Sequence, residues 1–133
     1  MKRPRTVPDC FERRKLLYDR KASREKLIST GELYLEAGRP YEAAEFFRKA
    51  SFQEGLKRLL DRALAEADGC LMEIALRGAP DGDRPATWAA LGRKAMELKK
   101  YSHAVRAFRR AGEAALVQEA EAALKEVLSF EKT

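Results

Sequence analysis

The sequence contains a single histidine, only two cysteines and no asparagine. Cys10 and Cys70 lie far apart, so they form neither a C-x-x-C pair nor a disulfide framework. We expect both to be buried, where cysteine behaves as a small apolar residue. His103 falls on a predicted helix, where we expect it to be exposed or to pack against a neighbouring helix. One histidine and two scattered cysteines do not make a zinc site, so we expect no metal centre.

Sequence patterns that mark catalytic and nucleotide-binding sites are also missing. There is no Walker-type glycine loop, no G-x-G-x-x-G and no G-x-S-x-G. Carboxylates are plentiful, but no pair of them stands out as an acid–base couple. We therefore expect a protein that is not an enzyme and that uses no cofactor.

Long hydrophobic runs are absent. No apolar stretch approaches the roughly 20 residues that a membrane-spanning helix needs. The first residues, MKRPRTVPDC, are charged and lack the apolar segment of a signal peptide. They also lack the bulky apolar residues of a membrane-surface anchor. We expect a cytoplasmic protein with no membrane partner.

The residues that are present favour an all-α protein. Hydrophobic residues make up 45% and charged residues 36% of 133 residues, which is typical of one helical domain. No stretch alternates apolar and polar residues with β-branched enrichment, so no sheet is expected. We predict six to eight helices.

Positive charge is concentrated at the N-terminus. Residues 1–26 hold ten Lys and Arg against four Asp and Glu, whereas the rest of the chain is balanced. Pro4 and Pro8 flank basic residues, which predicts a flexible basic arm over residues 1–8. Residues 9–133 are then a single helical domain.

Apolar residues recur at three- and four-residue steps along most of the chain. Asp9 and Ser23 are predicted N-caps of the first two helices. A long amphipathic stripe begins near Phe52 and continues to Ala75, with a break or kink expected at Asp68-Gly69. Residues 78–85, GAPDGDRP, predict a loop. The remaining helices are predicted over residues 10–21, 24–37, 40–50, 86–98, 101–111 and 113–128.

One helix–turn–helix pattern occurs twice, at an offset of 61 residues. Residues 27–50 and 88–111 match when they are aligned, with Gly31 on Gly92 and Phe47 on Phe108. A glycine inside a helix costs roughly 1 kcal/mol relative to alanine, so Gly31 predicts that another helix crosses closely there. Trp88 and Phe108 are predicted core residues.

This pattern resembles the tetratricopeptide repeat. The second copy carries the resemblance with Trp88, Leu91, Gly92, Ala95, Tyr101, Ala104, Phe108 and Ala111, and the first with Leu27, Gly31, Tyr34, Gly38, Ala43, Phe47 and Ala50. The resemblance implies a right-handed superhelical array of antiparallel helix hairpins, with repeat motifs at residues 24–50 and 86–111. Tandem copies would lie about 34 residues apart, and the usual terminal proline is missing. Both departures suggest an extra helix inserted after each pair.

The resemblance further implies a non-catalytic scaffold that binds another protein through a groove lined by the first helix of each pair. In this sequence the implied groove residues are Glu25, Ile28, Glu32, Leu35 and Glu36, then Ala86, Ala89, Arg93, Met96 and Glu97. The family's clamp for a terminal carboxylate does not match, so a basic or amphipathic peptide or helix is the expected ligand. The chain's own helices covering this face, and self-association through it, are the alternatives.

Nucleic acid, RNA in particular, is the rival partner. The candidate phosphate-binding residues are Arg13, Arg14, Lys15, Lys99, Lys100, Arg109 and Arg110. Aromatic residues that could stack on bases are scarce near them, with Tyr101 the one candidate in the second cluster. We therefore expect a protein partner ahead of nucleic acid.

Overall fold

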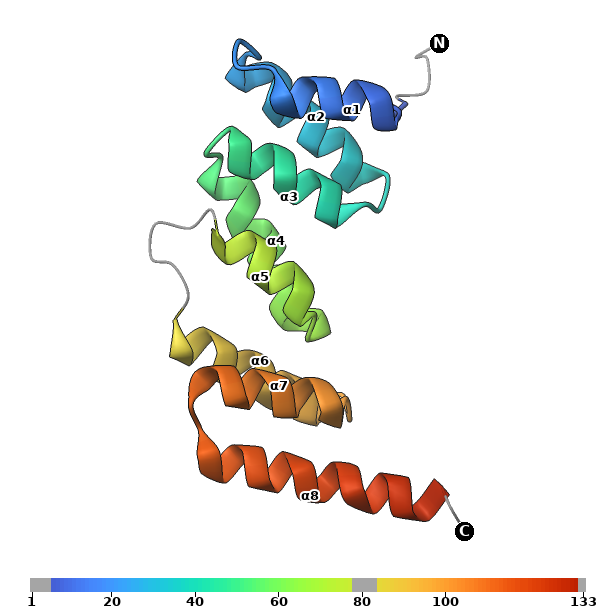
Figure 1. Cartoon of the computed structure of the whole chain (residues 1–133), viewed down its shortest axis with the longest axis vertical. Coiled ribbons are helices and arrows are strands. Elements are labelled where there is room, and N and C mark those ends of the chain that lie inside the picture. The colour runs from blue at the N-terminus through green and yellow to red at the C-terminus, as the bar shows by residue number, and fades with distance from the viewer. Residues whose placement is uncertain (1–5, 78–83, 132–133) are drawn as a thin grey trace.

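The computed structural model describes residues 6–77 and 84–131, and every regular element within these ranges is an α-helix (Figure 1). The predicted all-α class is therefore confirmed. No helix in the described ranges combines the length and the apolar character that crossing a bilayer requires. The helices are α1 (Cys10–Tyr18), α2 (Arg24–Glu36), α3 (Pro40–Lys49), α4 (Gln53–Glu66), α5 (Gly69–Arg77), α6 (Pro85–Glu97), α7 (Tyr101–Ala111) and α8 (Ala114–Glu131).

Local sequence signals set most helix ends. The Asp9 side chain accepts a hydrogen bond from the Glu12 amide at 2.8 Å, and the Ser23 hydroxyl accepts one from the Lys26 amide at 3.1 Å. Both predicted N-caps are thus confirmed. Helix α1 ends earlier than predicted, because the Asp19 carboxylate accepts from the Lys21 amide and turns the chain.

The segment between the two repeat copies is itself a helix hairpin. Helix α4 ends at Glu66, and Ala67 takes a left-handed conformation with φ 54°. The Asp68 carboxylate then accepts from the Leu71 amide and caps α5, which packs against α4. The expected break at Asp68-Gly69 is confirmed. The expectation of one extra helix is wrong after the first pair, whereas a single helix, α8, does follow the second pair.

Three hairpins therefore follow one another: α2–α3, α4–α5 and α6–α7. Their first helices begin at Arg24, Gln53 and Pro85, which are 29 and 32 residues apart. These two spacings together make the offset of 61. Each lies near the spacing of tandem helical-hairpin repeats.

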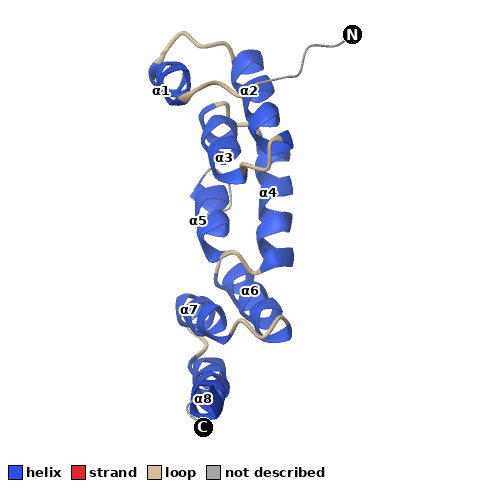
Figure 2. Ribbon diagram, turned by 90° about the vertical axis from the view of Figure 1, so that its right-hand side faces the viewer, coloured by secondary structure: helices blue, strands red, loops and turns tan. Residues whose placement is uncertain are grey.

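The hairpins stack along the long axis of the molecule. Helices α2, α4 and α6 lie along one side, and α3, α5 and α7 along the other (Figure 2). Helix α1 sits at the N-terminal end beside α3, and α8 packs on α7 at the opposite end (Figure 1). A right-handed superhelix stays a prediction.

Glycine–phenylalanine contacts hold the hairpins together. A Cβ on Gly31 would lie 2.5 Å from Phe47, and one on Gly92 would lie 2.4 Å from Phe108. The close helix crossing predicted at Gly31 is therefore confirmed. The Phe47 ring also reaches Gly55 of α4, where a Cβ would lie 2.7 Å from it. One ring thus joins the first hairpin to the second.

The repeat is visible in the backbone even where the sequence differs. Gly38 and Lys99, at the offset of 61, both have positive φ values, 76° and 60°. Ser51 and Gly112, at the same offset, have φ values of 53° and 74°. The first pair lies in the turns after α2 and α6, and the second pair in the turns after α3 and α7.

Burial follows the predictions for the aromatic core and departs from them for the cysteines. Trp88 is 4% exposed and Phe108 is 2% exposed, as expected for core residues. Cys10 and Cys70 are both exposed free thiols, so the prediction that they are buried is wrong. Cys10 begins α1, which buries none of its residues, and Cys70 lies at the start of α5 on the rim of a cleft.

Two predictions fall partly outside the described residues. The flexible arm covers residues 1–5, which are not described, and residues 6–8, which are. Val7 packs against the core, and the Pro8 carbonyl accepts a 2.9 Å hydrogen bond from the Tyr34 hydroxyl. Of the predicted loop over 78–85, residues 78–83 lie outside the described ranges.

Candidate interaction surfaces

The predicted groove begins on α2. This helix buries Leu27, Gly31 and Tyr34 in the interior of the molecule. Ile28 follows the buried Leu27, and Leu35 follows the buried Tyr34. Both are half-buried, so part of each side chain is open to solvent. Charged side chains flank them, of which Glu25 and Glu36 are exposed and Glu32 is half-buried.

The second part of the predicted groove lies on α6. Met96 is half-buried, while Ala86, Arg93 and Glu97 are exposed. Ala89 is buried at 5% exposure, so it offers a ligand little surface. Arg93 and Glu97 give this end of the face both signs of charge.

Helix α4 lies between these two parts, and the sequence prediction missed its contribution. Arg58 of α4 forms a two-pronged ion pair with Glu32 of α2, and α6 packs directly on α4. The hydrogen bonds that Arg58 donates to the Glu32 carboxylate hold the pKa of Arg58 above its usual value. The first-helix face therefore runs from α2 across α4 to α6, and Glu32 is neutralised within it.

Aligning α4 with α2 at their 29-residue spacing identifies the side chains that α4 adds to this face. The positions equivalent to Ile28, Glu32 and Leu35 are Lys57, Asp61 and Leu64. Leu64 is half-buried, whereas Lys57 and Asp61 are exposed. The 29- and 32-residue spacing could have revealed these positions, had the middle hairpin been recognised.

The N-terminal helix does not cover this face. Helix α1 lies beside α3, where the Lys49 ammonium donates 2.8 Å hydrogen bonds to the carbonyls of Leu16 and Asp19 at the end of α1. Arg13 adds a long ion pair to Glu42 of α3 at 3.8 Å. Figure 2 shows α1 on the side of the second helices, away from α2, α4 and α6.

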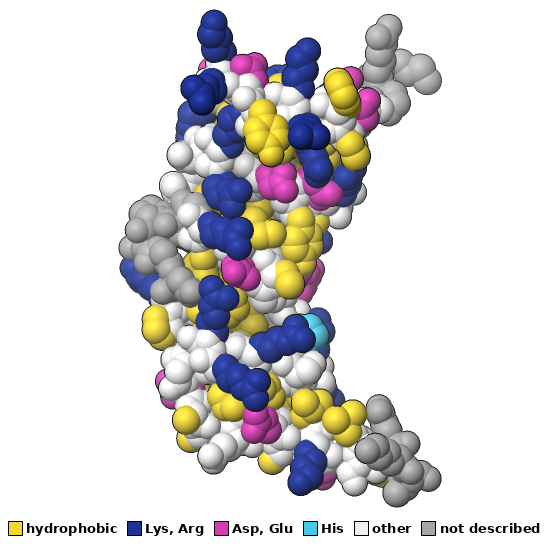
Figure 3. Space-filling view, in the orientation of Figure 1, with side chains coloured by type: hydrophobic (Ala, Val, Ile, Leu, Met, Phe, Trp, Pro, Cys, Tyr) yellow, Lys and Arg dark blue, Asp and Glu magenta, His cyan; other side chains and the backbone are white. Residues whose placement is uncertain are grey.

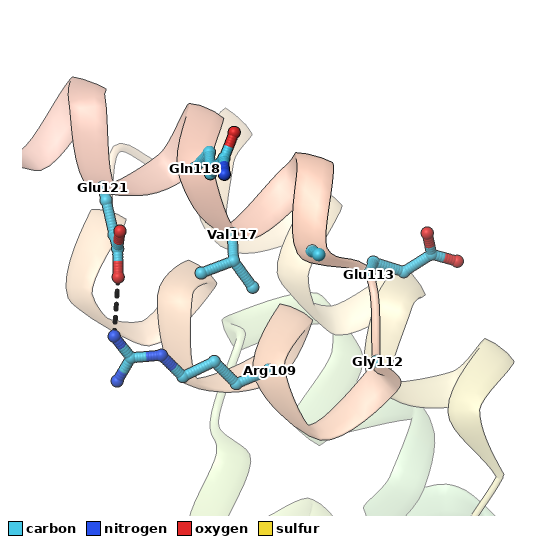
Figure 4. A pocket seen from close by; sticks show the side chains of 7 residues that line it. Arg109, Gly112, Glu113, Val117, Gln118 and Glu121 are labelled. Atoms are coloured by element: carbon cyan, nitrogen blue, oxygen red, sulfur yellow. Dashed lines mark hydrogen bonds and ion pairs between the residues drawn. The ribbon is translucent and has the colours of Figure 1, made fainter.

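The predicted basic patch is not one surface. Arg13, Arg14 and Lys15 are on α1 at the N-terminal end of the stack, whereas Lys99 and Lys100 lie at the α6–α7 turn and Arg109 and Arg110 end α7. Several of these cations tie helices together. Lys100 donates to the Glu66 carbonyl at 2.8 Å, and Arg109 pairs with Glu121 of α8 at 2.6 Å (Figure 4).

The side formed by the second helices is nevertheless rich in cations. Figure 3 shows Lys and Arg side chains recurring down this side, with a smaller number of acidic groups among them. Arg48 of α3 and Arg106 of α7 are also exposed.

A cleft of about 230 Å3 opens on the same side between α5 and α7. The third hairpin packs on the second through α6 and α4, and α7 hardly touches α5. Trp88, Leu91 and Ala107 supply apolar walls. Arg110 crosses the opening, with its guanidinium 4.6 Å from the Trp88 ring centre and 3.6 Å from Glu73. The cleft depends on how hairpins stack, so no local sequence signal could have predicted it.

A second hollow lies where α8 leaves α7 (Figure 4). Gly112, with φ 74°, turns the chain between the two helices, and Val117 forms an apolar wall. The ion pair of Arg109 with Glu121 spans the hollow, so it is a packed junction between helices.

Within the described residues, no three His, Cys, Asp or Glu side chains converge in a way that could hold a metal ion. Comparison with protein-family models, with curated proteins and with solved structures finds no match for the chain. The resemblance to tetratricopeptide repeats therefore rests on the residues themselves.

Proposed function

We propose that the protein is a non-catalytic interaction module of the tetratricopeptide-repeat type, which captures a peptide or helix of a partner protein on the first-helix face. One observation carries this proposal. Half-buried apolar side chains occur on all three neighbouring first helices, namely Ile28 and Leu35 on α2, Leu64 on α4 and Met96 on α6. Such side chains can bury further area against a ligand without unfolding the module.

The charges around these apolar residues suggest the ligand's chemistry. On α2, Glu25 and Glu36 are exposed, while Glu32 is neutralised by Arg58. Further along the face, Lys57 and Arg93 add exposed positive charge. An amphipathic helix with an apolar stripe and a basic end over α2 fits this arrangement best.

The test is capture of partner proteins from an extract of the native host, using the immobilised full chain and two face variants. Leu35→Asp and Met96→Asp each place a charge on the face at a half-buried position. A protein bound through the face is retained by wild type and lost from both variants, while circular dichroism shows that the variants remain helical. Leu128→Asp, on α8, is the matched control and should retain the same protein. Equal capture by all four chains would contradict the proposal.

Nucleic-acid binding is the second candidate, and the cations on the second-helix side favour it (Figure 3). It predicts binding to single-stranded RNA that weakens steeply as salt increases and that falls when Arg13, Arg14 and Lys15 are neutralised. We rank it second because Arg13, Lys100, Arg109 and Arg110 are already engaged with groups of the chain itself. Fluorescence anisotropy with a labelled RNA separates the two candidates.

A further inference from the structure

Exposed apolar surface is concentrated at the two ends of the helix stack. Within the described residues, seven large hydrophobic side chains are exposed, and five of them lie on α1 or α8. The three most exposed are Phe11 at 82%, Tyr18 at 77% and Phe130 at 82%. Terminal helices of repeat arrays usually present a polar outer face, because nothing packs on them. Apolar residues at both ends therefore point to an interface.

The surface on α1 is apolar with a basic centre. Phe11 and Tyr18 are seven residues apart and thus share one face of the helix. Together with Arg14 and Lys15 they line a shallow groove of about 620 Å3. The Arg14 guanidinium lies 5.8 Å from the Tyr18 ring centre. Over its length, α1 carries three basic residues and one acidic residue.

Helix α8 also exposes apolar side chains, and as a whole it is acidic. Leu124 and Leu128 line a groove of about 440 Å3 with Glu121, Lys125 and Ser129. Val127 and Leu128 are 40% and 50% exposed. Over its length, α8 carries four glutamates and one lysine. The two terminal helices thus both expose apolar side chains and are opposite in net charge.

These surfaces lie at opposite ends of an elongated molecule, so one chain cannot pair its own α1 with its own α8 (Figure 1). We propose that the chain associates head to tail, with the Phe11–Tyr18 face of α1 in one copy packing on the Leu124–Leu128 face of α8 in the next. The contact is heterologous, so it leaves a free surface at each end and allows further copies to add. Pairing like ends would instead bring two acidic α8 helices, or two basic α1 helices, together. This inference does not rest on the proposed first-helix groove, because the two surfaces share no residue.

The test uses two full-length variants, each with one disabled end, in sedimentation velocity experiments across a wide range of protein concentration. Phe11→Asp with Tyr18→Asp disables α1, and Val127→Asp with Leu128→Asp disables α8. All four side chains are exposed, so both variants should remain folded, which circular dichroism checks. Wild type is expected to form oligomers that grow with concentration and shrink as salt is added. Each variant alone is expected to be monomeric.

Mixing the two variants gives the decisive result. Head-to-tail association predicts a one-to-one heterodimer that grows no further, because each variant retains one intact end. If the α1 variant dimerises alone, the interface joins two α8 helices and the proposal is wrong; if the α8 variant dimerises alone, it joins two α1 helices and the proposal is equally wrong. A monomeric wild type at every concentration also overturns it. Leu35→Asp, in the first-helix groove, is the control and should assemble as wild type does, which separates this proposal from the groove proposal.

Discussion

Gly92→Ala tests the packing on which the repeat depends. The added Cβ would lie 2.4 Å and 2.5 Å from two ring carbons of Phe108. Non-bonded carbons are normally about 3.5–4.0 Å apart, so the ring or a helix backbone must shift by about 1 Å. The ring is 2% exposed, so little free space surrounds it.

The magnitude follows from two opposing effects. Overpacking a tight core costs about 1–3 kcal/mol. Because the added Cβ would lie about 1 Å closer to the ring than a normal contact, we expect a cost near the upper end of this range. Replacing a helical glycine by alanine returns about 1 kcal/mol of helix propensity. We expect a net loss of about 2 kcal/mol in the free energy of unfolding, measured by urea denaturation with circular dichroism.

A matched control and a rescue make the result specific. At Gly69 a Cβ would meet only Trp88, at an ordinary 3.7 Å, so Gly69→Ala should leave stability unchanged or slightly higher. Adding Phe108→Leu to Gly92→Ala shortens the side chain and should recover stability, with a coupling free energy of about 1 kcal/mol or more. If Gly92→Ala is as stable as wild type, or if the two substitutions are additive, the close contact does not determine the helix crossing.

Three further predictions concern the core, the turns and a hydrogen bond between hairpins. Phe108→Ala should lower the free energy of unfolding by about 3–5 kcal/mol, and a loss below about 1 kcal/mol in a urea titration would contradict its burial. Lys99→Gly and Ser51→Gly should each raise the free energy of unfolding by about 1 kcal/mol, because glycine adopts their positive φ without strain. A lower melting temperature in thermal denaturation would contradict this. Burial and the 2.6 Å hydrogen bond that Tyr41 donates to Asp68 raise the pKa of Tyr41. The folded chain therefore keeps this proton above pH 10, where an unfolded tyrosine loses it, and stability falls as the pH rises further. Tyr41→Phe should make that alkaline decline shallower, and an unchanged slope between pH 10 and 12 would refute the assignment.

The sequence predicted the two outer hairpins well because their packing leaves a local trace. A glycine is the eighth residue of α2 and of α6, and a phenylalanine is the eighth residue of α3 and of α7. Each glycine makes room for the ring of the facing helix, so the pair stands out when the chain is aligned with itself.

The break at Asp68-Gly69 was predicted, but the middle hairpin was not recognised as a repeat because it fills the equivalent places differently. Leu60 is the eighth residue of α4, and Leu76 is the eighth residue of α5. Neither place holds a glycine or a phenylalanine, so this hairpin does not stand out when the chain is aligned with itself. The contribution of α4 to the first-helix face was missed for the same reason.

The exposed cysteines and the cleft between α5 and α7 depend on contacts between hairpins. Cys70 occupies the second position of α5, and its exposure follows from how far α7 stands from that helix. Helical periodicity reports which side of a helix faces inward within one hairpin. It carries no information on the gap that opens when two hairpins stack.

The third hairpin and α8 share a small core cluster with Ala67, and its composition bears on the order in which the helices unfold locally. Four of its six buried residues are alanines, namely Ala67, Ala95, Ala104 and Ala120, and the last of these is the only buried residue in the described part of α8. Each helix in such a stack is held only by its neighbours, so resistance to local unfolding varies along the chain. Amide hydrogens of α1, which buries none of its residues, and of α8 are therefore expected to exchange with solvent first, while those of α3, which carries Phe46 and Phe47, should persist longest. Local opening is thus expected to begin at the two ends of the stack and to reach the first hairpin last.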